Sequence, residues 1–151
     1  MTKGLTTLIH EVVWAMDRKA DEILKRDYGI SVSWFRVLVV LKDTAPITQH
    51  SLAQRLRHSD PAVSRLLERM TKSGLLSVAI DPDHGRKRLV SLTPAGRSVV
   101  VSADSALEDL FVSDLTQAQI DISEFSSSMS ALSLHLIRPP ITEGTTGNVD
   151  S

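Results

Sequence analysis

A two-residue alternation of side chains occurs in one part of this chain and limits the folds available to the rest. Leu76, Val78 and Ile80 alternate with Ser77 and Ala79, and residues 89–92 form a matching segment. Alternation of this kind is typical of β-strands, and the Pro and Gly between the two segments predict a turn. Because the flanking segments show helical spacing, we expect a mainly α-helical protein with one small β-hairpin.

Two short helices are predicted directly before the hairpin. Thr48 is a suitable N-cap for the first of them. Asp60 followed by Pro61 is interpreted as the N-cap and first-turn proline of the second, which ends at Gly74. A helix, a tight connector, a second helix and a hairpin make a winged helix–turn–helix, whose second helix enters the major groove of DNA.

The segment before this unit predicts two further helices. The first is long and amphipathic, and it runs from about Leu5 to Tyr28–Gly29. Ser31 or Ser33 can cap the next. The apolar stripe of the first helix is longer than one small winged domain can cover.

Two helices are also predicted after the hairpin. The first starts at Thr93–Pro94 and ends near Phe111, and Thr116 with Gln119 forms a capping box for the second. Apolar residues of the second helix repeat at steps of four and three, which suits packing between helices. Packing within one chain would satisfy both long stripes, but burial in a homodimer is the favoured interpretation. The polar residues 139–151 are expected to form a disordered tail.

Charge is distributed unevenly along the chain. The net charge is −1, yet residues 47–100 hold nine Lys or Arg against four Asp or Glu. Residues 101–151 hold one basic residue against eight acidic ones. A basic middle segment in a near-neutral protein indicates local contact with a polyanion. Arg86, Lys87 and Arg88 at the expected hairpin tip fit contact with DNA phosphates.

Several classes of function lack the residues they need. The sequence has no cysteine, which excludes disulfides and thiolate chemistry. No apolar run is long enough to cross a bilayer, so we expect a cytoplasmic protein without a membrane partner. The histidines are scattered and no catalytic constellation is present, so we expect no enzyme activity, no metal site and no cofactor.

The middle of the chain resembles the multiple-antibiotic-resistance regulator (MarR) family. The resemblance rests on an ordered set of short motifs: Leu52-Ala53, Val63-Ser64-Arg65, Gly74-Leu75, His84-Gly85-Arg86 and Leu92-Thr93 followed by Gly96. The resemblance depends on the order and spacing of the whole set and not on any one motif. With the helix order, the resemblance covers about residues 5–136.

The resemblance implies a single winged helix–turn–helix unit over residues 1–138. Its dimerisation helices would lie at about 5–28 and 94–137, and its DNA-binding lobe at about 47–93. The expected protein is a homodimer that binds a pseudo-palindromic double-stranded DNA operator. It would act as a repressor that a small aromatic or phenolic molecule releases.

The same resemblance assigns three groups of DNA-contacting residues and one group for the effector. The recognition helix would use Pro61, Ala62, Ser64, Arg65, Arg69 and Lys72. The wing would use His84, Arg86, Lys87 and Arg88. Thr48, Gln49 and His50 would meet the DNA backbone, although an ordinary helix cap is the simpler role for Thr48. The effector would meet His10, Trp14, Arg18 and Trp34, although Trp34 on an apolar face fits a core position.

The chain departs from the family pattern in the wing. His84 stands where the family has an acidic residue that holds the wing arginine, so Asp81 or Asp83 takes over this role or the wing is looser. The first wing strand lacks basic residues, so DNA contact would depend on Arg86 to Arg88. The alternative function is a winged-helix dimer that has lost DNA binding and acts as a protein-interaction scaffold.

Overall fold

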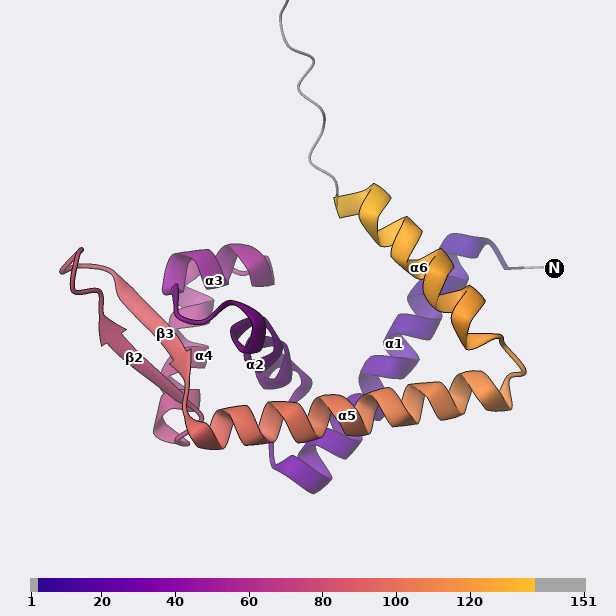
Figure 1. The fold of residues 1–151 in the computed structure, drawn as a ribbon, viewed down its shortest axis with the longest axis horizontal. Helices are drawn as coiled ribbons and strands as arrows, with labels where there is room; N and C mark the ends of the chain where they lie inside the picture. The colour runs from indigo at the N-terminus through magenta and orange to yellow at the C-terminus, as the bar shows by residue number, and fades with distance from the viewer. Residues whose placement is uncertain (1–2, 138–151) are drawn as a thin grey trace, which may run out of the picture. The chain divides into compact units, whose positions relative to one another are not determined.

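The computed structural model describes residues 3–137 and confirms a mainly helical chain with a small antiparallel sheet (Figure 1). The chain divides into two compact units between Asp109 and Leu110. The expected tail at 139–151 lies outside the described residues. Among the described residues, no helix is long and apolar enough to span a bilayer. The elements are α1 (Leu5–Ile23), η1 (Leu24–Tyr28), α2 (Val32–Thr44), β1 (Ile47–Thr48), α3 (Gln49–Leu56), α4 (Asp60–Lys72), β2 (Leu76–Ile80), β3 (Arg88–Leu92), α5 (Pro94–Gln117) and α6 (Ile122–Ile137).

The first unit has one continuous apolar core. The second and fourth helices each turn one apolar face to this core, and the central residues of these faces are almost completely buried. Burial of each such side chain removes apolar surface from water and is the main source of stability. The core residues of α2, α3, α4 and the sheet are Val37, Leu38, Leu41, Leu52, Ala53, Val63, Leu67, Met70, Leu76 and Val90.

The N-terminal helix ends as predicted at Gly29, which has a left-handed φ of 67°. Its last turn, η1, is π-helical and places Leu24 in the core. By contrast, α1 has no buried residue. Of the two candidate caps for α2, Ser31 is the cap, because its Oγ accepts a hydrogen bond from Trp34 N at 3.3 Å.

Two carboxylates connect helices of the first unit. The Asp21 carboxylate accepts hydrogen bonds from Lys25 Nζ at 2.5 Å and from Val32 N at 3.1 Å, and these partners lower the pKa of Asp21. Asp21 thereby connects the end of α1 to the first turn of α2. Lys42 of α2 lies 2.5 Å from Asp104 of α5, and this hydrogen bond raises the pKa of Lys42.

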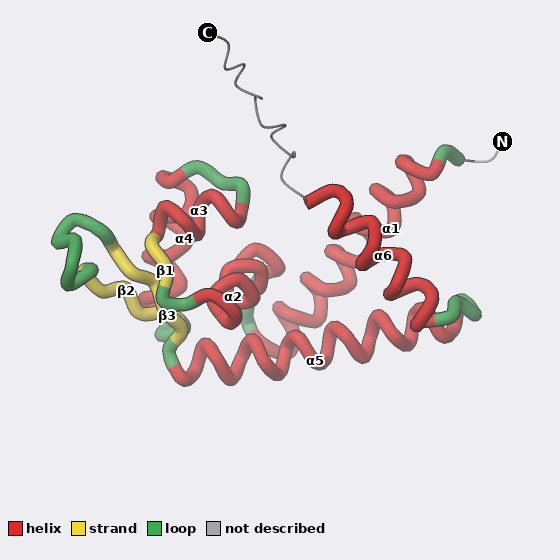
Figure 2. Tube along the Cα trace, turned by 45° about the horizontal axis from the view of Figure 1, so that its top comes forward, coloured by secondary structure: helices red, strands yellow, loops and turns green. Residues whose placement is uncertain are grey.

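The sheet has three strands, in the order β1-β3-β2, and not only the predicted hairpin (Figure 2). β2 and β3 pair antiparallel with Leu76 opposite Leu92 and Ile80 opposite Arg88. β1 pairs with β3 on its other side, with Ile47 opposite Val90. A two-residue strand is too short to show alternation, which is why the sequence pattern missed it.

Two predicted boundaries near the C-terminus are wrong. α5 continues past Phe111 to Gln117, and Thr116 is inside it, with its hydroxyl donating to Val112 O at 2.8 Å. The expected capping box of Thr116 and Gln119 therefore does not form. α6 begins at Ile122, and Asp121 Oδ1 accepts from Glu124 N at 2.8 Å, which is the contact of an N-cap.

The start of α5 contacts the backbone that follows α4. Thr93 N donates to Leu75 O at 3.1 Å, and Thr93 Oγ1 donates to Gly74 O at 2.6 Å. Thr93 Oγ1 also accepts from Gly96 N at 3.0 Å, so Thr93 is the N-cap of α5. A Cβ at Gly96 would lie 2.0 Å from Leu75 O. Only glycine fits this contact without movement of one backbone segment.

We predict that Gly96→Ala lowers the free energy of unfolding by about 1–3 kcal/mol or more, because the added methyl group forces the two backbones apart. Gly85→Ala is the matched control, since a Cβ there meets nothing within 4 Å. We expect the control to change stability by less than about 0.5 kcal/mol. Urea denaturation of both variants measures the difference, and equal stabilities would contradict the close contact.

Candidate nucleic-acid interface

An open groove of about 670 Å³ lies where α3, α4 and the hairpin come together. Seven of the predicted DNA-contacting residues line it, and sequence reasoning missed two others, Ser51 and Asp60. The full lining is Thr48, Gln49, His50, Ser51, Asp60, Ser64, Arg86, Lys87 and Arg88. The groove thus collects residues from the three elements that the sequence assigned to DNA contact.

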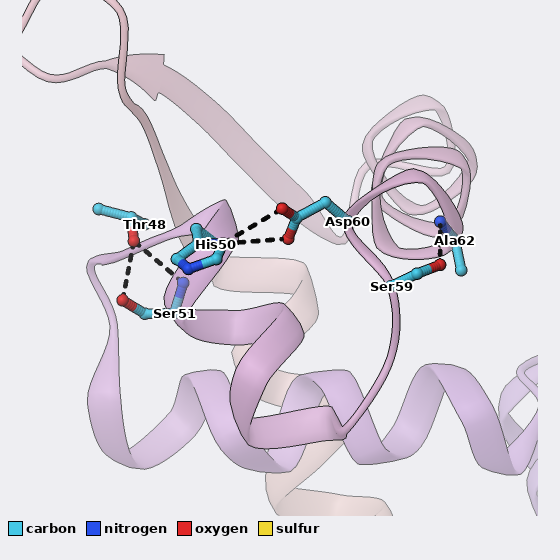
Figure 3. Close-up of polar contacts among 6 residues, drawn as sticks. All are labelled: Thr48, His50, Ser51, Ser59, Asp60 and Ala62. Carbon is cyan, nitrogen blue, oxygen red and sulfur yellow. Dashed lines mark hydrogen bonds and ion pairs between the residues drawn. The ribbon is translucent and has the colours of Figure 1, made fainter.

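The start of α3 forms one side of the groove. Thr48 Oγ1 accepts from Ser51 N at 3.1 Å and donates to Ser51 Oγ at 2.8 Å (Figure 3). Thr48 is therefore the N-cap of α3, as the sequence predicted. The N-terminus of a helix has unpaired N–H groups and a partial positive charge, which favour anions. Gln49 and His50 stand in this first turn and line the groove.

The start of α4 forms the facing side, and here the predicted cap is wrong by one residue. Ser59 is the N-cap, because its Oγ accepts from Ala62 N at 3.4 Å. Asp60 is instead the first helical residue, and Pro61 follows in the first turn. The Asp60 carboxylate extends across to His50 of α3, whose Nδ1 lies 3.2 and 3.3 Å from its two oxygens (Figure 3).

The wing tip is held by its backbone. Asp81 N donates to Lys87 O at 2.8 Å, and Lys87 N donates to His84 O at 2.8 Å. The Asp81 carboxylate accepts from Asp83 N at 2.9 Å and lies 3.6 Å from His84 Nδ1. Asp81 therefore organises the turn. Within residues 3–137, neither Asp81 nor Asp83 forms an ion pair with Arg86, so neither holds the wing arginine.

The three wing cations have no acidic partner in the part of the chain that the structure describes. Arg86, Lys87 and Arg88 are all exposed, and they face a groove whose lining contains one carboxylate, that of Asp60. Positive charges that lie close together in a loop repel one another unless an anion screens them. The groove therefore has the charge expected of a polyanion-binding surface.

The remaining recognition-helix residues fall into different surroundings. Lys72 lines a neighbouring cavity of about 340 Å³ and pairs with Glu68 at 3.0 Å. The Arg69 guanidinium lies 5.8 Å from the centre of the Trp34 ring, a cation–π contact with α2. Arg65 is exposed and has no ion-pair partner among residues 3–137. Six predicted DNA-contacting residues do not line the groove: Pro61, Ala62, Arg65, Arg69, Lys72 and His84.

The candidate effector residues form no single cluster. Trp14 is 66% exposed on α1, with the Arg18 guanidinium 5.5 Å from its ring centre. His10 is exposed on the same helix. Trp34 is half-buried against the core and covered by Arg69. None of the four lines either cavity beside α4.

Known proteins resemble this chain both in sequence and in fold. A sequence model of the MarR family matches residues 28–87. None of the curated proteins matches the chain in sequence. Apo wild-type MarR from E. coli shares 26% identity and a TM-score of 0.75, over 90% of this chain and 99% of that chain. A mutant E. coli MarR complexed with operator DNA has 26% sequence identity and a TM-score of 0.73, over 87% of this chain and 93% of that chain. MepR from S. aureus in its DNA complex has 22% sequence identity and a TM-score of 0.72, over 89% of this chain and 97% of that chain.

We predict that Ser59→Ala lowers the free energy of unfolding by about 0.5–2 kcal/mol, because it removes the N-cap of α4. Asp60→Ala loses the interaction of an acidic residue with the helix N-terminus, about 0.3–1 kcal/mol, and an exposed contact with His50 that adds little stability. Urea denaturation followed by circular dichroism compares the two. A larger loss in Asp60→Ala than in Ser59→Ala would mean that Asp60 is the cap in solution.

Proposed function

We propose that this chain, which belongs to the MarR family, is a sequence-specific DNA-binding transcriptional regulator. The observation that carries the proposal is the cationic groove. Arg86, Lys87 and Arg88 have no acidic partner among the described residues, and they lie beside the N-termini of α3 and α4. DNA phosphates supply the missing anions, and each neutralised phosphate releases counterions and adds affinity.

The roles of the DNA-contacting residues follow from their positions. α4 enters the major groove, where Ser64 and Arg65 of its first half read base edges. The wing cations contact the flanking backbone, and Arg86 can enter a narrow minor groove. The first turn of α3, with Thr48, Gln49 and His50, contacts phosphate. Arg69 and Lys72 are engaged by Trp34 and Glu68, so their part is to support α4 and to add positive charge.

The working form in this proposal is a homodimer. The apolar stripe of α1 is exposed, with Leu5 at 74% and Val12 at 51%. In the second unit, α6 also has no buried residue, and Met129 and Leu132 are 49% and 42% exposed. Apolar stripes of this length on helices favour burial against a second copy. A two-fold dimer would read a pseudo-palindrome with half-sites about 10 bp apart.

The proposed regulation is repression that a small aromatic or phenolic anion relieves. Trp14 offers an exposed ring, and Arg18 beside it offers a positive charge. A ligand releases DNA only if it binds the DNA-incompetent conformation more tightly. His10 lies on the same helix as Trp14. Trp34 is set apart by its burial and its contact with Arg69. The protein would act in the cytoplasm by binding and not by catalysis.

The function is tested by selecting genomic fragments with the purified protein and measuring the affinity of the enriched fragment by fluorescence anisotropy. We predict a pseudo-palindrome whose affinity falls steeply with salt. Arg65→Ala should weaken base preference by about 1–3 kcal/mol at one position of each half-site. Arg86→Ala should weaken all DNA alike and reduce the salt slope by about 1.

Arg97→Ala removes a cation from the exposed side of α5, outside the groove, and should leave the slope unchanged. If a folded protein enriches no fragment even at low salt, DNA binding is wrong and a protein-interaction scaffold takes its place.

We predict that Val12→Glu weakens dimerisation about tenfold or more, because it places an unpaired charge in the apolar stripe of α1. Thr7→Glu adds the same charge on the opposite side of this helix and should leave the dimer intact. Analytical ultracentrifugation over a dilution series measures both. Equal dissociation of the two variants, or a monomeric wild-type protein, would contradict burial of the stripe in a dimer.

A further inference from the structure

The proposed DNA-binding groove contains one carboxylate, that of Asp60, among its cations. Asp60 is the first residue of α4, its side chain is 55% exposed, and it lines the groove with three cations. A carboxylate in this position repels phosphate and lowers affinity for DNA in general. Its presence therefore calls for a compensating role.

The two roles that Asp60 could have within its own helix leave this position unexplained. Ser59 already caps α4, so the carboxylate is not needed for the helix N–H groups. The remaining benefit, a negative charge near the helix N-terminus, does not require the side chain to face the groove. Instead the carboxylate extends toward α3, where His50 Nδ1 meets both oxygens at 3.2 and 3.3 Å (Figure 3).

We propose that Asp60 is a specificity-determining residue that accepts a hydrogen bond from the exocyclic amino group of cytosine. This inference rests on the proposed function. The first residues of a recognition helix are the ones that reach base edges in the major groove. There a carboxylate can pair only with an amino donor, which is N4 of cytosine or N6 of adenine.

The chemistry of the two bases favours cytosine. In adenine the N6 donor is adjacent to the N7 acceptor, whose lone pair would face the carboxylate. In cytosine the N4 donor has no acceptor of the same base beside it in the major groove. Asp60 therefore gains a hydrogen bond at cytosine and meets repulsion at the acceptors of the other bases.

His50 is the positioning residue of this pair. Its ring nitrogen contacts both carboxylate oxygens, so it orients the carboxyl group and leaves lone pairs on each oxygen for a base. A charged donor is also available in the groove, but Arg86, Lys87 and Arg88 lie on the wing and not on the helix pair. His50 thus holds Asp60 in place from α3 while the cations meet phosphate.

The test is a panel of single-base changes in the enriched operator, measured by anisotropy for wild type and for Asp60→Asn, Asp60→Ala, His50→Ala and His50→Asn. Wild type should require cytosine at one symmetric pair of positions, with a loss of about 5- to 150-fold for other bases. Asp60→Ala should lose this preference. Asp60→Asn should prefer adenine at the same positions, because an amide pairs with adenine N6 and N7.

The histidine variants separate a positioning role from a merely structural one. His50→Ala should reduce the cytosine preference, and His50→Asn should restore it, because its amide nitrogen can donate where Nδ1 does. Thermal melting checks that each variant is folded. Affinity for unrelated DNA should rise slightly in Asp60→Ala and keep its salt dependence.

Two results would overturn the proposal, and they differ from each other. If Asp60→Ala binds all sequences more tightly and every base preference is unchanged, the carboxylate acts only through its charge. If the wild-type protein enriches no fragment at all, the proposed function itself has failed and this inference fails with it.

Discussion

The contact between the backbone of Gly96 and the carbonyl of Leu75 sets the geometry on which the interface depends. At this point the end of α4, the start of β2, the end of β3 and the start of α5 are joined within a few residues. Thr93 binds the carbonyls of Gly74 and Leu75 and caps α5 at once. Because Gly74 adopts a φ of 79°, α4 can end where the first wing strand begins. The hairpin is thus held against α4, and its cations line the groove beside this helix.

Local charge, and not net charge, gives the groove its chemistry. The chain as a whole carries −1. Elsewhere among residues 3–137 several cations are paired, as in Arg36 with Asp17 at 2.6 Å and Lys42 with Asp104 at 2.5 Å. In the groove, Arg86, Lys87 and Arg88 have no such partner within residues 3–137. A protein arranged this way stays near neutrality overall while one face attracts a polyanion.

Most of the helices could be predicted from the sequence because their caps are local and their buried faces are periodic. Thr48 and Ser31 cap the helices that they were expected to cap.

The errors also have local causes. Ser59 and Asp60 are both good caps, so spacing alone could not choose between them. Thr116 resembled a cap but is satisfied inside α5 by the carbonyl of Val112. The groove's cations were found from the sequence. The contact between the Asp60 carboxylate and His50 could not be predicted from the sequence, because it depends on how α3 and α4 pack.

Hydrogen–deuterium exchange with and without the enriched DNA fragment tests the central claim most directly. We expect slower exchange in three separate segments, residues 48–51, 60–65 and 84–88, because DNA would cover the groove that they line. We expect no change around the Gly96 contact, which is already buried. If DNA slows exchange elsewhere and leaves these three segments unchanged, the groove formed by α3, α4 and the wing is not the DNA-binding surface.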